Sequence, residues 1–271
     1  KKNMKTDEFL RQVTALPGVT GNERAAAEFI AEAFRPYVDE VKITALNSVI
    51  AHKKGNGPKV LVCAHLDEIG MMVSKIEKDG TLRMQSVGGV DPRVLPGMRV
   101  RVFAREGMLM GVVGATPPHL MREADRKNNY TFETLFVDLG LPAEEVEKKV
   151  KIGDTVCFES RYVELKNGRV STKTVDDRGC VAIMLRAAEL LQKMHHEADL
   201  YFVSTCQEEI GSYGAMTTAF EVDPDFGVAF DVCHAETPGA PRLYTNKIDS
   251  LVASKGPFLH PYLVKKLEEA A

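Results

Sequence analysis

The sequence of 271 residues has no tryptophan, few cysteines and no long apolar run. No apolar stretch approaches the roughly 18 to 20 residues that a membrane-spanning helix needs, and the first residues lack the apolar segment of a signal peptide. We therefore expect a cytoplasmic protein with no membrane partner. Lysine and arginine together number 35 against 38 acidic residues, which gives a formal charge of −3. Nothing in this charge balance points to a nucleic-acid partner.

The cysteines form an odd set with no CxxC spacing, and most lie in apolar surroundings. We interpret all five as reduced core thiols: Cys63, Cys157, Cys180, Cys206 and Cys233. An apolar share of 44% and a charged share of 27% are ordinary for a globular protein. This composition excludes a disordered, collagen-like or coiled-coil chain, and a chain of this length can form one large domain or two smaller ones.

Apolar periodicity predicts alternating helices and strands at both ends of the chain. Helical spacing occurs near residues 7–16, 25–34, 178–194 and 212–220, and short β-branched runs occur at 41–46, 49–52, 60–64, 200–205 and 226–230. The middle of the chain reads as short strands joined by tight turns. The pattern predicts an α/β fold with a discontinuous domain of residues 1–70 and 165–271, and a β-rich insert of residues 71–164.

Four polar clusters each follow an apolar strand or precede a helix. They are His65-Leu66-Asp67-Glu68, Asp176-Asp177-Arg178, Glu208-Glu209 and Asp231-Val232-Cys233-His234. The carboxyl ends of parallel strands lie along one edge of a sheet, so these side chains should converge. Carboxylates that crowd together repel unless a cation neutralises them, and oxygen ligands with an imidazole suit zinc, cobalt or manganese. The pattern predicts a metal site.

Each cluster also has a plain structural interpretation. A histidine after a strand is often only hydrogen-bonded in the core, although Asp67 is placed to accept the second N–H of His65. The pair Asp176-Asp177 can cap the helix that follows, because acids in a first turn complement the helix dipole. Similarly, Glu208-Glu209 can be a solvated loop pair, Asp231 a turn residue and His234 a core or surface histidine. No cluster is decisive by itself.

The same segments, taken together, resemble the tetrahedral aminopeptidases, which are dinuclear metallopeptidases. The segments that carry the resemblance are Ala64–Gly70, Val175–Arg178, Gln207–Gly211 and Phe230–Ala235. In the insert, Val87–Pro92, Gly114–His119 and Leu135–Gly140 resemble the β-barrel domain of this family. The resemblance covers nearly the whole chain in the same order. It implies a mixed-sheet aminopeptidase domain with an inserted β-barrel, in a family that includes glutamyl and deblocking aminopeptidases and is often labelled as endoglucanases.

Site roles follow from this resemblance by position. Asp176 would be the carboxylate that bridges two metal ions, His65 and Asp231 would complete one site, and Glu209 would contribute to the other. Glu208 would be the general base and Asp67 would orient His65. Asp177 would shape the bridging loop, and the choice between the two aspartates rests on the resemblance alone. The other histidines, His119, His195, His196 and His260, receive no role.

The implied reaction is removal of N-terminal residues from peptides. A water molecule acidified by the two cations would lose its proton to Glu208 and attack a peptide carbonyl that one metal polarises. Glu208 would then protonate the departing amine. Peptides are therefore the expected partners, and the resemblance implies a hollow homo-oligomer, a dodecamer. Side-chain preference and the native metal are not specified by the sequence.

Three alternatives remain open. A deacylase or carboxypeptidase of the related fold can share a similar ligand set, although the insert argues against it. An endoglucanase would use Glu208 with another acid, but sugar clefts favour broad aromatic platforms, and this chain has no tryptophan and only 7% aromatic residues. A non-catalytic relative would fold in the same way without holding both metals.

One ligand expected from the resemblance has no counterpart in the sequence. In the family, a histidine on a C-terminal strand completes the second metal site, and no histidine follows His260 here. The segment around His260 resembles the region before the family's last helices, so we do not assign it this role. We expect the natural chain to continue beyond Ala271, and the alternative is a form with one damaged metal site.

Overall fold

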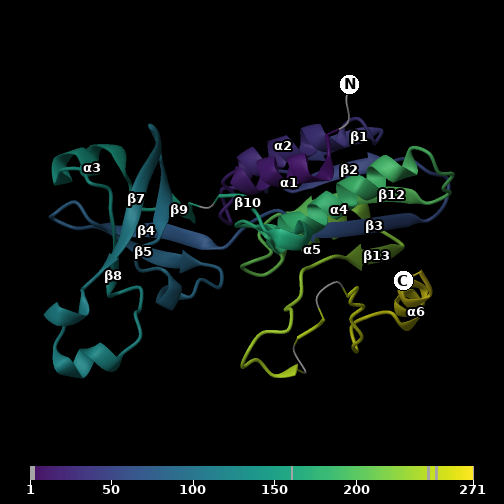
Figure 1. The fold of residues 1–271 in the computed structure, drawn as a ribbon. Coiled ribbons are helices and arrows are strands. Elements are labelled where there is room, and N and C mark those ends of the chain that lie inside the picture. The colour runs from purple at the N-terminus through teal and green to yellow at the C-terminus, as the bar shows by residue number, and fades with distance from the viewer. Residues whose placement is uncertain (1–3, 160, 243–244, 248–249, 271) are drawn as a thin grey trace. The chain divides into compact units, whose positions relative to one another are not determined.

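The computed structural model describes residues 4–159, 161–242, 245–247 and 250–270. Contacts divide the chain into two units, Lys1–Asp231 and Val232–Ala271. The first unit contains a five-stranded mixed sheet and a closed six-stranded barrel, so the predicted α/β fold with an inserted barrel is confirmed (Figure 1). The domain boundaries expected at residues 70 and 164 stay a prediction.

The mixed sheet has the strand order β1-β2-β12-β3-β13. Its strands are β1 (Glu40–Ile43), β2 (Val49–Lys53), β12 (Asp199–Thr205), β3 (Lys59–His65) and β13 (Phe226–Ala229). β3 is parallel to both β12 and β13, whereas β2 is antiparallel to β1 and β12. The three parallel strands therefore end at the same edge of the sheet, which brings residues 65–67, 206–209 and 230–231 to that edge.

Helices cover both faces of this sheet. The helices α1 (Thr6–Ala15), α2 (Arg24–Phe34) and α4 (Val175–Leu191) lie on one face (Figure 1). Their apolar side chains share one core with β2, β3 and β12. On the opposite face, Val222 of α5 (Tyr213–Val222) packs with strand residues Ile50, Leu61 and Val203. The predicted apolar stripes of α1 and α2 are largely buried, as are Val181 and Met184 of α4, whereas Ile183 and Leu190 of α4 and Phe220 of α5 are exposed. α4 begins at Val175, three residues earlier than the periodicity indicated.

The barrel closes in the order β4-β5-β8-β7-β6-β9. Its strands are β4 (Gly70–Ile76), β5 (Leu82–Val87), β6 (Arg99–Ala104), β7 (Gly107–Ala115), β8 (Leu135–Asp138) and β9 (Thr155–Phe158). Alternate residues such as Val100, Val102 and Val113 fill its interior, as period-two strands require. α3 (Ala143–Lys149) adds Val146 to the same core. A short hairpin follows, with β10 (Val163–Glu164) and β11 (Val170–Ser171) antiparallel on either side of Asn167-Gly168.

The second unit, Val232–Ala271, contains α6 (Pro261–Ala270) and an isolated bridge between Ala235 and Asn246. Cys233 belongs to this unit and is exposed, so its assignment as a core thiol was wrong. The other four cysteines are free and buried or half-buried, as expected. None of the helices in the described ranges is long and apolar enough to cross a membrane.

Candidate metal centre

His65 lies at the edge where the parallel strands end. It is the last residue of β3 and pairs with Thr205, the last residue of β12. The backbone N–H of Leu66 donates to the carbonyl of Thr205 at 2.8 Å, so the two chains stay in register past the strand ends. The His65 side chain is only 3% exposed. Parallel pairing thus brings the first and third polar clusters together, as the sequence predicted.

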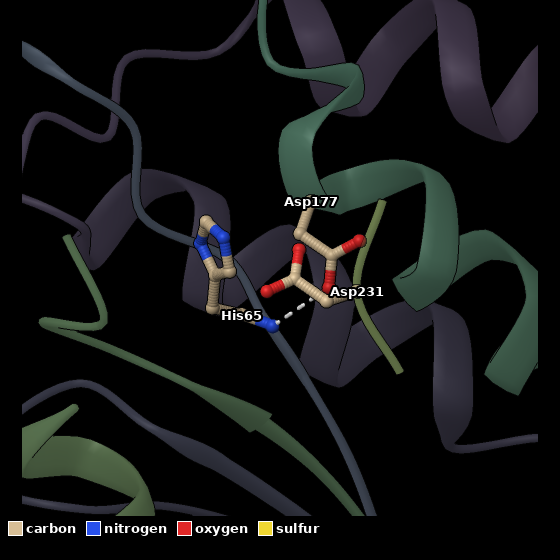
Figure 2. A group of neighbouring side chains, drawn as sticks. All are labelled: His65, Asp177 and Asp231. Carbon is tan, nitrogen blue, oxygen red and sulfur yellow. Dashed lines mark hydrogen bonds between the residues drawn. The ribbon is translucent and has the colours of Figure 1, made fainter. Parts of the chain in front are cut away.

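Both aspartates at the start of α4 face His65. Their backbone angles are non-helical, with φ −79° and ψ 105° at Asp176 and φ −121° and ψ 27° at Asp177. Asp176 Oδ1 lies 3.0 Å from His65 Nε2, and Asp177 Oδ2 accepts a hydrogen bond from the backbone N–H of His65 at 3.2 Å (Figure 2). Asp177 is fully buried, whereas the side chain of Asp176 is 58% exposed. The fourth cluster contributes Asp231, two residues after the end of β13.

Two groups of side chains have the geometry of a metal site. One is His65, Asp177 and Asp231 (Figure 2), and the other is His65, Asp176 and Glu209. Within each group, one ligand atom per residue lies within 4.8 Å of the others. His65 belongs to both groups. The resemblance would put Asp176 beside His65 and Asp231, whereas the structure puts Asp177 there, so the separate roles of the two aspartates stay a prediction.

Asp67 connects His65 to the two glutamates. Its carboxylate accepts the backbone N–H of Glu208 at 3.0 Å and that of Glu209 at 3.3 Å. Asp67 also contacts His65 Nδ1, through its backbone carbonyl at 3.2 Å and with its carboxylate at 3.5 Å. Glu208 Oε2 lies 3.9 Å from His65 Nε2. The four clusters therefore contribute at least one side chain each to a single place.

The charges of the cluster shift the pKa values of its members. Burial raises the pKa of Glu209 to about 7, opposed by His65 and assisted by the nearby acids, and burial likewise raises the pKa of Asp177 to about 7. Burial would lower the pKa of His65, but hydrogen bonds with Asp176 and Asp67 outweigh it and raise this pKa to about 11. Raised pKa values are the expected result for carboxylic acids that are buried and also lie near other acids.

The donor set fits a divalent cation. Several carboxylate oxygens and an imidazole nitrogen converge, which suits zinc, cobalt or manganese. In addition, Asp177 Oδ1 is buried and has no hydrogen-bond partner among the described residues, although it lies beside His65 and Asp231. A buried carboxylate oxygen without a partner is costly, and a bound cation would satisfy it.

A buried ionic network connects the segment after His65 with the start of α4. In this network, the Glu68 carboxylate pairs with Lys173 Nζ at 2.7 Å. The fully buried Arg178 donates to the carbonyls of Leu66, Val13 and Leu16. Arg178 therefore links the turn after His65 to the end of α1 and to the start of its own helix. Sequence analysis missed this network, and the only available signal was a charged residue directly after the two aspartates.

A separate groove of about 700 Å³ lies between β1, β2, β12 and the end of α5. Its lining includes Lys42 and Glu221, which form an ion pair, and His52 stacked on Tyr201 with ring centroids 4.1 Å apart. None of the candidate metal-binding residues is part of this lining. The groove is therefore separate from the candidate metal centre.

Comparison with known proteins identifies the family of the chain. The family model for M42 glutamyl aminopeptidases matches residues 47–271. The chain belongs to the M42 glutamyl aminopeptidase family. The M42 chain is 38% identical over 269 residues to the lysyl aminopeptidase of Pyrococcus furiosus, covering 97% of this chain and 77% of that protein. The predicted family is thereby confirmed, and the protein is a peptidase by family.

Solved structures agree with this assignment of the M42 chain. A TET aminopeptidase from a marine sediment archaeon of the Thaumarchaeota has a TM-score of 0.84 at 35% identity, with 87% of this chain and 68% of that one covered. A Pyrococcus horikoshii TET peptidase that can assemble into a tetrahedron or a large octahedral shell has a TM-score of 0.79 at 34% identity. That match covers 86% of this chain and 71% of the other.

Proposed function

We propose that this protein is a metal-dependent aminopeptidase that removes N-terminal residues from peptides. The proposed metal-binding residues are His65, Asp176, Glu209 and Asp231, with Asp176 as the bridging carboxylate and zinc or cobalt, or else manganese, as the metal. The observation that supports this most is the position of His65 Nε2, which lies 3.0 Å from Asp176 Oδ1 and 3.9 Å from Glu208 Oε2. A single imidazole thus adjoins both a proposed ligand and the proposed base.

The chemistry divides between the metals and the chain. Two bound divalent ions would supply an acidified water molecule and a polarised carbonyl. Glu208 is placed to take the proton of the attacking water, because its side chain is 37% exposed and borders the cluster. The same carboxylic acid then gives this proton to the departing amine, which restores the carboxylate. Asp67 holds the backbone of Glu208 and orients His65.

The proposed reaction also requires a free N-terminus on the substrate. A free N-terminal amine bound close to one of the proposed metal ions would fix the first peptide bond beside Glu208. Cleavage is then limited to the first residue.

Chromogenic aminoacyl anilides test this function. With cobalt or zinc added, the protein is expected to hydrolyse anilides with a free amino group and to hydrolyse the N-acetylated forms at least about 100-fold more slowly, because the group that the site recognises is blocked. A chelator should abolish the activity. Release of acetate from the acetylated forms without release of the chromophore would instead support the deacylase alternative, and release of C-terminal residues from peptides would support the carboxypeptidase.

Assembly is proposed on the strength of the solved relatives. The Pyrococcus horikoshii peptidase forms a tetrahedron or an octahedral shell, and another of its structures is described as a dodecamer. We propose a homo-oligomer, a dodecamer, for this protein as well. A molar mass in solution that corresponds to one chain would contradict this proposal.

A further inference from the structure

We infer that Thr20 is a positioning residue for the metal centre and acts through the carboxylate of Asp67. This inference rests on the proposed function, because it concerns how the proposed base and ligand are held. Thr20 lies in the segment between α1 and α2, 47 residues before Asp67 in the chain. Its hydroxyl donates to Asp67 Oδ2 at 2.7 Å, and the side chain is 5% exposed.

The Asp67 carboxylate contacts several residues of the proposed site. Oδ1 accepts the Glu208 N–H at 3.0 Å and lies 3.5 Å from His65 Nδ1. Oδ2 accepts the Thr20 hydroxyl at 2.7 Å and the Glu209 N–H at 3.3 Å. One buried carboxylate therefore contacts the proposed histidine ligand and the backbone of both proposed glutamates. Its orientation determines how these three residues are placed relative to one another.

The Thr20 hydroxyl is needed to fix the orientation of the Asp67 carboxylate plane. The terminal torsion of aspartate has a broad energy profile, so the hydrogen bonds to its two oxygens fix the plane. Without the hydroxyl, Oδ2 would keep only the longer bond to Glu209. The plane could then rotate, which would shift the Glu208-Glu209 backbone and weaken the contact with His65.

Thr20 is itself held rigidly. The preceding residue, Val19, forms a parallel bridge with Glu68, and the backbone N–H of Thr20 donates to the Glu68 carbonyl at 3.3 Å. In return, the Glu68 N–H donates to the Gly18 carbonyl at 2.9 Å. A β-branched side chain has few χ1 rotamers, so a fixed backbone leaves the hydroxyl with a fixed direction. The hydroxyl is thus a preorganised donor aimed at Asp67.

Thr20→Val removes the donor and keeps the shape and branching of the side chain. We expect kcat to fall about 10- to 100-fold, as is usual when a residue that supports a metal ligand is replaced, with a much smaller change in KM. We also expect weaker cobalt binding, measured by calorimetric titration with cobalt alone, and an altered visible spectrum of the cobalt-loaded protein. Thr20→Ser keeps the donor and should restore kcat and the spectrum to near wild-type values.

Thr218→Val is the matched control, because Thr218 is also a buried threonine but donates to the Gly214 carbonyl within α5. Its kcat, cobalt affinity and spectrum should stay unchanged. If Thr20→Val does not fold, Thr20→Ala is measured with the same expectations. Wild-type kcat, cobalt affinity and spectrum in the Thr20 variant would overturn the inference, even with lowered stability. If wild type hydrolyses no substrate, the proposed function fails, and the cobalt measurements still decide the role of Thr20.

Discussion

Replacement of Glu208 by glutamine is expected to lower kcat by about 100- to 10,000-fold, the usual contribution of a general base. Glutamine has nearly the same shape but cannot accept the proton of the attacking water. The backbone N–H of residue 208 still donates to Asp67, so the local structure should persist. Bound metal should be unchanged, because Glu208 belongs to neither group of candidate ligands. Initial rates at saturating substrate and equal metal loading measure the effect.

The control for this variant is Glu221→Gln. Glu221 lies on α5, pairs with Lys42 and has a side chain that is 42% exposed. Neutralising it should leave kcat within a factor of about two, because exposed ion pairs contribute little. If the Glu208→Gln protein retained the wild-type kcat, Glu208 would not be the general base, and the proposed mechanism would be wrong.

A large loss of stability is expected from Arg178→Met. Methionine fills a similar volume but removes the guanidinium that donates to the carbonyls of Val13, Leu16 and Leu66. It also removes a positive charge whose Nη2 lies 3.8 Å from the buried Glu68 carboxylate. Breaking a buried ionic network on one side typically costs about 3–5 kcal/mol of the free energy of unfolding. Urea unfolding of both proteins with excess chelator measures this loss without a contribution from metal binding.

Two further variants define the role of Arg178. Arg178→Lys keeps the positive charge but lacks the planar guanidinium that donates to three carbonyls. Its loss in free energy of unfolding should therefore be intermediate. Arg186→Met is the control on the same helix, because Arg186 is 49% exposed and pairs only at the surface with Glu189. Arg186→Met should change the free energy of unfolding by no more than about 0.5 kcal/mol. A loss below about 1 kcal/mol for Arg178→Met would show that the network does not hold these segments together.

The strand ends and their polar residues were predictable because the signals are local. An apolar run followed at once by a polar cluster marks the end of a buried strand, and this located His65 and Glu208. The convergence of these clusters followed from one topological rule for parallel strands, which the pairing of β3 with β12 and β13 obeys. The fold and the surroundings of the site were therefore accessible from the sequence.

The contacts that hold the site were not predictable, because they join distant segments. Thr20 meets Asp67 across 47 residues, and Arg178 meets Leu66 across 112. Apolar periodicity does not predict the burial of a charged residue such as Arg178, because charged side chains are buried only when distant parts of the chain supply partners. The orientation of Asp176 and Asp177 depends on non-helical backbone angles at the start of α4, and helical spacing does not encode those angles.

We propose that His65 and the surrounding acids form a site for two metal ions. Elemental analysis of the natural full-length protein, after loading and removal of loosely bound metal, counts the cobalt or zinc ions that each chain retains. Two ions per chain are expected, because the proposed bridging carboxylate of Asp176 can contact two ions, with His65 and Asp231 completing one site and Glu209 contributing to the other. One ion or none per chain would contradict this proposal and would favour a non-catalytic relative with the same fold.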